Sequence, residues 1–306
     1  MNAITQSSAP PVPTRPAWQP IALGEHGVLK PGKLRWLRAC AWAIPLFFLV
    51  AIPAGAITQF LGGFWPKTNE PMQFVAGLLG ALASLGIYAL AVHLVEKRRA
   101  SEIALRPMLP QLSIGLLTGL VMFAAVMGIM GVFGFYDIHG VGPAPAWTPL
   151  RKAIQAGVVE ELMMRAVLLR LLWRAFGPWA AFALSSAVFG FSHLGNPNAT
   201  VFAALCIALE AGVMLGAFYA LTGRIWVSIG THMAWNFTQG YLFGTAVSGT
   251  ALGPAIAQST PNPAVAEWLT GGAFGPEASL PGLLVCLAVG LMVVWMAWRR
   301  GQFAKQ

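Results

Sequence analysis

The chain of 306 residues has a composition far from that of a soluble protein. Hydrophobic residues make up 57% of it and charged residues 9%, whereas about 25% of the residues in a typical soluble domain are charged. This balance excludes a soluble globular domain and indicates an integral membrane protein that crosses the bilayer several times. The formal net charge of +9 does not indicate a nucleic-acid partner, because Lys and Arg cluster at the ends of apolar runs, as topology signals do.

The composition divides the chain into four parts. Residues 1–30 are a polar tail rich in Pro and Ser, which we expect to be disordered and cytoplasmic. Residues 31–111 are expected to form an N-terminal transmembrane hairpin with a basic cytoplasmic loop, and residues 112–245 a core that carries the candidate site. Residues 246–306 combine an outer loop rich in Gly and Pro with a C-terminal transmembrane helix.

Apolar runs that are long enough to cross a bilayer, which takes about 20 helical residues, follow one another along most of the chain. They predict an all-α fold, a polytopic transmembrane helical bundle of about eight helices. Neither a strand pattern nor an internal repeat competes with this prediction. The expected spans cover about 37–61, 73–95, 112–134, 149–173, 178–194, 199–222, 224–245 and 281–298.

Basic residues predict the orientation of the bundle. They precede the first span and follow the second, fourth, sixth and last, which an even number of spans places on one side of the membrane. The positive-inside rule makes that side cytoplasmic, so both termini are expected in the cytoplasm and the loop 246–280 outside. Arg151 and Lys152, at the outer start of the fourth span, are exceptions. The residues that follow the rule are Lys33, Arg35, Arg38, Lys97, Arg98, Arg99, Arg106, Arg174, Arg224, Arg299, Arg300 and Lys305.

The fourth span carries two adjacent glutamates, Glu160 and Glu161, and an arginine four residues later, Arg165. Ionisable residues inside a span are costly and are functional-site candidates. Successive helical residues point about 100° apart, so the two glutamates cannot have the same role. Glu161 and Arg165 have the favourable order and spacing for an ion pair. Glu160 has no local partner, which suits a general base.

Two later spans supply histidines. Phe189 and His193 share a helix face, so the aromatic ring can form a wall of the site and orient the imidazole. His232 and Asn236 also share a face, and a His and an amide side by side can position a water or donate hydrogen bonds to a developing oxyanion. Small residues flank these positions and allow close helix packing; they are Gly157, Ser185, Ser186, Gly190 and Gly230.

Each feature alone also has an ordinary structural interpretation. A single His in a span is often a hydrogen-bonded core residue, and Glu161 with Arg165 can be a structural ion pair. Glu210, a further acid within an apolar run, is interpreted as meeting a solvated helix end. The sequence lacks His-Glu-x-x-His and Gly-x-Ser-x-Gly, and Asp137 is its single aspartate. It therefore excludes zinc site-two, serine elbow and aspartyl dyad proteases.

The motifs resemble those of the CAAX prenyl protease type II and bacteriocin-processing family of membrane peptidases, also called the abortive-infection family. The similarity extends from the third to the seventh span, and residues 95–107 and 269–277 also resemble family segments. The motifs that carry the resemblance are Glu160-Glu161-x-x-x-Arg165, Phe189-x-x-x-His193 and His232-x-x-x-Asn236.

The resemblance implies an intramembrane endopeptidase whose site comprises Glu160, His193, His232 and Asn236. The eukaryotic relatives remove the last three residues of prenylated proteins, and bacterial relatives serve self-immunity, protein processing or anchoring. We therefore expect a location in the bacterial inner membrane, and a membrane-associated protein or peptide as substrate, lipidated or not. The family does not identify which substrate this chain cleaves.

Two mechanisms fit these residues. In one, Glu160, His193 and His232 hold a divalent metal, such as zinc, whose bound water attacks the peptide carbonyl. In the other, which we favour, Glu160 and His193 activate water directly while His232 and Asn236 form the oxyanion site. A proton- or solute-coupled transporter or a non-enzymatic membrane scaffold is the alternative from another class. The lack of an inverted repeat with paired broken helices argues against a transporter.

Overall fold

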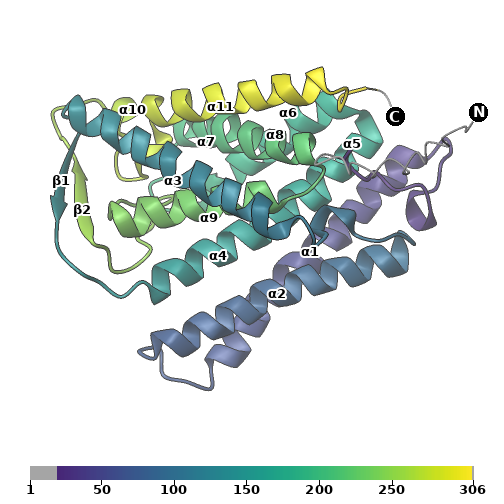
Figure 1. The fold of residues 1–306 in the computed structure, drawn as a ribbon, viewed down its shortest axis with the longest axis horizontal. Coiled ribbons are helices and arrows are strands. Elements are labelled where there is room, and N and C mark those ends of the chain that lie inside the picture. Colours follow the sequence, from purple (N-terminus) through teal and green to yellow (C-terminus); the bar gives the residue numbers. More distant parts are fainter. Residues whose placement is uncertain (1–18, 305–306) are drawn as a thin grey trace, which may run out of the picture.

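The computed structural model describes residues 19–304 as a bundle of long helices with one small sheet (Figure 1). The N-terminal hairpin consists of α1 (Arg35–Gly62) and α2 (Glu70–Val95), followed by α3 (Met108–Val132). The remaining helical elements are η1 (Gly27–Leu29), η2 (Ser101–Ile103), α4 (Trp147–Glu161), η3 (Leu162–Leu169), α5 (Arg170–Phe176), α6 (Pro178–Ser192), η4 (His193–Gly195), α7 (Val201–Ile207), η5 (Ala208–Gly212), α8 (Val213–Thr222), α9 (Trp226–Phe237), η6 (Thr238–Leu242), α10 (Glu267–Thr270), η7 (Pro276–Ala278) and α11 (Leu280–Arg299).

Each of the predicted spans corresponds to a helical segment, which confirms the predicted all-α membrane bundle. Among residues 19–304, five helices are long and apolar enough to cross a membrane: α1, α2, α3, α11 and the continuous helix Val201–Thr222. The segments around α4, α6 and α9 differ from these five. α4 carries several charged residues, and α6 and α9 are only 15 and 12 residues long.

Local sequence signals start the long helices. The side chain of Asn69 accepts a hydrogen bond from the amide of Met72 at the beginning of α2. Ser279 caps α11 in the same way by accepting from the amide of Gly282, at 3.1 Å. Both helices also have a proline in the first turn, where its missing N–H costs nothing. These caps fix where two of the predicted spans begin.

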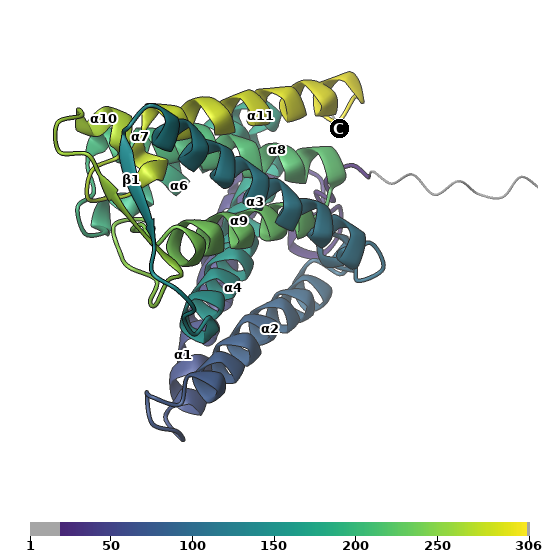
Figure 2. The ribbon, with the colours of Figure 1, turned by 60° about the vertical axis from the view of Figure 1, so that its left-hand side comes forward.

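The helices run back and forth between two ends of the bundle. The loops that hold α10 and the sheet lie at one end, while α5, the start of α1 and the end of α11 lie at the other (Figure 1). Figure 2 shows the hairpin of α1 and α2 at one edge, next to α4, and α11 at the opposite edge. The elements that carry the predicted motifs lie between these two edges.

Close helix packing around the site depends on glycines. A Cβ on Gly157 of α4 would overlap the side chain of Met233 on α9. A Cβ on Gly190 of α6 would overlap the carbonyl of Ala204 on α7. Both glycines lie within four residues of a predicted motif residue. The expectation that small residues allow close approach here is confirmed, and it explains how side chains of separate helices reach one another.

A two-stranded sheet lies outside the helical core. β1 (Tyr136–Gly140) pairs antiparallel with β2 (Ala257–Pro261), with Ile138 opposite Ser259. The sequence did not predict these strands, because each has five residues and lies in a polar, Pro-containing segment. The sheet joins the loop after α3 to the long loop before α10.

The segment 19–30 differs from the expected disordered tail, since it packs on the bundle; residues 1–18 lie outside the described part of the chain. Ile21 and Leu29 are buried. The amide of Gln19 donates to the carbonyl of Thr222, and Arg174 donates to the carbonyl of Leu29, at 2.9 Å. Two apolar side chains and backbone hydrogen bonds thus order a polar segment.

A cluster of four charged residues, three of them fully buried, fastens the hairpin to the core. Arg170 of α5 donates to both carboxylate oxygens of Glu96, at 2.7 and 2.9 Å. Arg98 donates to Glu96 at 2.7 Å and to both oxygens of Glu102, at 2.7 and 2.9 Å. Both carboxylates are fully buried. We call Glu96, Arg98, Glu102 and Arg170 the hairpin cluster.

Two neutral groups complete the hairpin cluster. The indole N–H of Trp42 on α1 donates to Glu96 at 2.9 Å, and the hydroxyl of Tyr88 on α2 donates to Glu102. Burial alone would raise the pKa of Glu96 and Glu102, but the arginines outweigh it and hold both pKa values below the ordinary range. Both carboxylates are therefore ionised at neutral pH and bonded on every side.

Candidate active site

The two glutamates lie where α4 changes into a π-helical segment, η3. The side chain of Glu161 is fully buried, whereas that of Glu160 is 35% exposed. Adjacent residues on this helix therefore occupy different environments, as the sequence predicted. π-helical turns are rare and frequently occur at functional sites, and this one follows the glutamates directly.

Glu161 is hydrogen-bonded to two other residues of the predicted motifs. Its Oε1 accepts hydrogen bonds from Nη1 of Arg165 and from Nδ1 of His232, both at 2.9 Å. The predicted ion pair of Glu161 and Arg165 is thus present. The bond to His232 was not predicted, because it joins residues 71 positions apart. Oε2 of Glu161 has no hydrogen-bond partner among the described residues.

Arg165 connects three helices. Besides Glu161, it donates from Nη2 to the carbonyl of Ala211 in the π-helical segment η5, at 2.8 Å. Its guanidinium also lies 4.6 Å from the centre of the Phe189 ring on α6, a cation–π contact. Arg165 is 2% exposed, so its charge is stabilised by these protein groups and not by bulk solvent.

The two histidines are oriented through the same ring nitrogen. Nδ1 of His193 lies 2.7 Å from the carbonyl oxygen of Phe189. A carbonyl oxygen can only accept, so Nδ1 carries the proton, and in the neutral ring Nε2 holds the lone pair. The same reasoning applies to His232, whose Nδ1 donates to the Glu161 carboxylate. Nε2 of His232 lies 3.9 Å from Oε2 of Glu160.

Phe189 packs between these groups. Its ring meets the His193 ring edge to face at a centroid distance of 5.0 Å and the His232 ring at 6.3 Å. The sequence predicted that Phe189 would wall the site and orient His193, and both contacts are present. One aromatic ring thereby sets the positions of two imidazoles and of Arg165.

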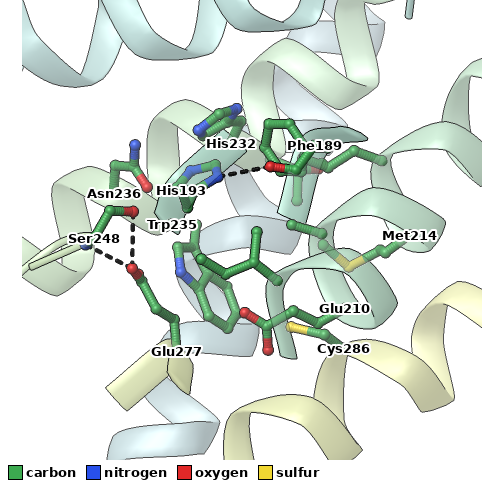
Figure 3. Close-up of a pocket in the computed structure, with 14 residues that line it drawn as sticks. Phe189, His193, Glu210, Met214, His232, Trp235, Asn236, Ser248, Glu277 and Cys286 are labelled. Carbon is green, nitrogen blue, oxygen red and sulfur yellow. Dashed lines mark hydrogen bonds between the residues drawn. The ribbon is translucent and has the colours of Figure 1, made fainter. Parts of the chain in front are cut away.

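His193, His232 and Asn236 line one cavity of about 40 Å³ (Figure 3). The structure thus brings together three of the four residues that the motifs predict to act directly. Glu160 and Glu161 do not line this cavity. Glu160 instead lies next to a residue that does line it, since its Oε2 is 3.9 Å from Nε2 of His232.

Two acids on the opposite side of the cavity were not predicted to belong to the site (Figure 3). Glu210 is 2% exposed, so its interpretation as a residue at a solvated helix end is wrong. A lone acid within an apolar run is the signal that pointed to Glu160, and it applies equally to Glu210. Glu277 lies in the long outer loop, at the end of the segment 269–277 that resembles the family, and that resemblance was the signal that could have pointed to it.

Glu277 is held by Ser248, which also lines the cavity. Its Oε1 accepts hydrogen bonds from the amide of Ser248 at 2.6 Å and from the Ser248 hydroxyl at 2.9 Å. Burial raises the pKa of Glu277, while these hydrogen bonds act in the opposite direction. A protonated Glu277 would reduce the negative charge on this side of the cavity.

The arrangement of donors does not match a metal centre. Among residues 19–304, no group of three or more His, Cys, Asp or Glu side chains is placed so that it could hold a metal ion. Glu160, His193 and His232, the set predicted for a metal-dependent mechanism, do not form such a group. We therefore derive no step through a metal, and metal dependence stays a prediction to be tested by chelation.

Comparison with known proteins adds an independent observation. Residues 142–238 match the family model described as Rce1-like, type II CAAX prenyl endopeptidase Rce1-like. This segment of the chain is similar to that family. It contains all three motifs, and the match confirms the family resemblance that they indicate. No curated protein and no solved structure gives a significant match.

The Rce1-like match over residues 142–238 and the five apolar helices support a membrane protein that is similar to CAAX-type endopeptidases at the family level. That similarity implies a lipid bilayer and a peptide substrate. The roles of single residues and the identity of the substrate belong to the proposal that follows.

Proposed function

We propose that the chain is an intramembrane endopeptidase that hydrolyses a peptide bond of a membrane-associated protein or peptide. The observation that carries the proposal is the convergence of His193, His232 and Asn236 on one cavity within the Rce1-like segment. Glu160 lies beside this convergence as the one partly exposed acid of α4. Water-activating and oxyanion-binding groups therefore meet at one position inside the bundle.

In the proposed reaction, Glu160 and His193 activate a water molecule by accepting its proton as its oxygen attacks the scissile carbonyl. The proposal requires the carbonyl to lie between Glu160 and the two histidines. The negative charge that develops on the carbonyl oxygen is stabilised by His232 and Asn236. When His232 carries two protons, Nδ1 bonds to Glu161 and Nε2 is free to donate to that oxygen.

Collapse of the tetrahedral intermediate breaks the C–N bond. The leaving nitrogen takes up the proton removed from water, which His193 can return through Nε2 because Nδ1 stays bound to the Phe189 carbonyl. Glu161 and Arg165 do not exchange protons in this scheme. They keep His232 in the orientation that the oxyanion requires, which is a positioning role.

We further propose a bacterial inner membrane location with both termini in the cytoplasm. The basic loop between α2 and α3 and the end of α11 lie at one end of the bundle (Figure 1). The loops that carry α10 and the sheet lie at the other. This separation supports the orientation expected from the positive-inside rule. Labelling of single cysteines placed at each end of the bundle in intact cells tests it.

The function is tested by comparing membrane proteomes. Three strains are compared: a deletion strain, the same strain expressing wild-type protein, and one expressing Glu160→Gln. We expect the same uncut precursor in the deletion and Glu160→Gln strains and its processed form with wild type. The exposed Glu267 of α10 supplies the matched control, since Glu267→Gln should restore processing. Identical proteomes with normal expression would contradict a peptidase and favour a transporter or scaffold.

Once a substrate is found, measurements of kcat and metal content distinguish the metal-dependent from the metal-free mechanism. If His232 and Asn236 bind the oxyanion, His232→Ala and Asn236→Ala should lower kcat strongly without changing metal content. Exhaustive chelation should then leave cleavage intact. Stoichiometric zinc that is lost in His193→Ala and His232→Ala, and that returns together with activity, would overturn the metal-free scheme.

A further inference from the structure

Two polar side-chain atoms of residues that line the cavity have no hydrogen-bond partner in the described part of the chain. Oε2 of Glu210 and Oγ1 of Thr231 are buried and make no hydrogen bond to any described residue. Both residues line the cavity that His193 and His232 also line. Buried polar atoms are nearly always bonded to protein or to ordered water, because leaving one unbonded costs about 1–3 kcal/mol. These two atoms therefore point to a ligand that the chain itself does not supply.

The size of the cavity restricts that ligand. Its volume of about 40 Å³ exceeds the roughly 10–15 Å³ that one water requires. It is far below the roughly 300–1,000 Å³ of sites for small organic ligands. A water also needs between two and four polar partners, and Glu210, Thr231, Asn236 and the histidines provide them. Size and polarity together identify water.

The backbone around Glu210 resembles that around the predicted catalytic residues. Glu210 lies in η5, a π-helical segment that interrupts the helix Val201–Thr222. Further π-helical segments follow Glu161 and Asn236 closely, at η3 and η6. Arg165 donates to the carbonyl of Ala211, the residue after Glu210. The ion pair of the site thus also fixes the turn that presents Glu210.

We propose that Glu210 and Thr231 form an internal water site that stores water beside His193, His232 and Asn236 and supplies it to the hydrolysis. The inference rests on the proposed function, since each cleavage consumes one water molecule. Side chains that line the cavity, such as Thr231, Met214 and Cys286, are at most 3% exposed. Exchange with bulk water is therefore limited, and a stored molecule shortens the path. Glu210 and Thr231 are positioning residues that act through this water.

Radiolytic footprinting tests the site without any substrate. A short X-ray pulse converts water inside a protein into hydroxyl radicals, which oxidise the side chains that they touch. Met214 and Cys286 line the cavity and are 3% and 1% exposed. Met127 is fully buried in the core and does not line it, so it is the matched control within the same molecule.

We expect Met214 and Cys286 to be oxidised severalfold faster than Met127 in wild-type protein. Glu210→Leu, which removes the carboxylate and fills space with apolar atoms, should bring the rate at Met214 down to that at Met127. Equal rates at Met214 and Met127 in the wild type would overturn the water site. An unchanged Met214 rate in Glu210→Leu would assign the water to other groups and also overturn it.

Kinetics provide the second measurement. Thr231→Val and Glu210→Leu should each lower kcat about tenfold, the equivalent of one lost hydrogen bond, and leave KM unchanged. Glu210→Gln keeps hydrogen-bonding atoms and should retain most of the activity. Met214→Leu changes the same cavity without removing a polar group and should be active. If Glu210→Leu fails to fold, Thr231→Val and Glu210→Gln still decide the question.

The outcomes distinguish this inference from the proposed function. Loss of cleavage in Glu160→Gln together with wild-type kcat in Thr231→Val and Glu210→Leu would overturn the water site and leave the peptidase intact. A positive footprint at Met214 with no peptidase substrate would keep the water site and contradict its role in hydrolysis.

Discussion

Two groups of buried charges lie in this bundle, and they differ in how completely they are bonded. In the hairpin cluster, both oxygens of Glu96 and of Glu102 accept hydrogen bonds from arginine. At the candidate active site, one oxygen of Glu161 and one of Glu210 have no partner among the described residues. Glu160 is partly exposed there. The carboxylates of the hairpin cluster are thus fully hydrogen-bonded, whereas those of the candidate active site are not.

This difference in hydrogen bonding distinguishes buried charges with a structural role from those available for binding or catalysis. A complete cluster has no atom left to offer a substrate, so its contribution is to hold α5 against the hairpin. An incomplete group carries an energetic cost that packing alone does not explain. Perturbed ionisable groups that line a cavity are functional-site candidates. We therefore expect substitutions in the two groups to affect different measurements.

The largest effect is expected at Glu160. Glu160→Gln keeps size and polarity but removes the base, and general-base catalysis typically contributes about 10²–10⁴-fold. Cleavage should fall by that factor, while expression and thermal unfolding in detergent stay as in wild type. Substantial cleavage by the variant would remove the mechanism. Loss of expression would place Glu160 with the hairpin cluster as a structural residue.

The ion pair of Glu161 and Arg165 should affect both stability and activity. Glu161→Ala leaves a buried arginine charge without its partner, which costs about 3–5 kcal/mol. The free energy of unfolding should fall by that amount, as it should in Arg165→Ala. The double variant Glu161→Leu/Arg165→Met removes both charges and should recover most of the stability.

Activity then sharpens the interpretation of the double variant. Its kcat should stay low, because Nδ1 of His232 has lost its acceptor and the imidazole is no longer held in one orientation. Wild-type stability in both single variants would mean that the two side chains are not paired. Full activity in the double variant would mean that Glu161 does not orient His232.

Substitution of Arg170 tests the structural role of the hairpin cluster. Arg170→Met removes the bidentate contact to Glu96 and leaves Arg98 as the one arginine of the cluster, shared by two buried carboxylates, Glu96 and Glu102. The free energy of unfolding should therefore fall by about 3–5 kcal/mol, as for other broken buried ion pairs. The kcat of the folded fraction should stay at the wild-type value. A large fall in kcat without a change in stability would show that the hairpin cluster is coupled to the site.

Sequence reasoning succeeded where a contact depends on spacing within one helix. Glu161 with Arg165 and Phe189 with His193 are four residues apart, and helical geometry makes such pairs neighbours. The spans were predictable for a similar reason, since an apolar run of sufficient length has few alternatives in a bilayer. The fold class and the composition of the motifs follow from these local rules.

Contacts that depend on helix packing were not accessible in this way. His232 bonds to Glu161 across 71 residues and Arg170 to Glu96 across 74 residues, and no local pattern selects those partners. Glu277 reaches the cavity because Ser248 and the outer loop hold it there. Residues 19–30 are ordered by contacts with helix ends that lie far away in the sequence.

The smallest expected effect is the pH dependence of the stability that the hairpin cluster provides. Because the folded-state pKa values of Glu96 and Glu102 lie below their ordinary value of 4.5, the unfolded chain binds protons at a higher pH than the native protein does. The stability that these carboxylates contribute is therefore complete at neutral pH, and it declines as the pH falls below the ordinary value.

Arg170→Met removes the main cation that lowers the pKa of Glu96. The difference in thermal midpoint between wild type and Arg170→Met should thus be greatest near pH 7 and should shrink as the pH is lowered toward 4. Thermal unfolding in detergent across this range, with Arg299→Met at the exposed end of α11 as the control, measures it. A difference that stays constant would mean that the arginine stabilises the bundle through packing rather than through its charge.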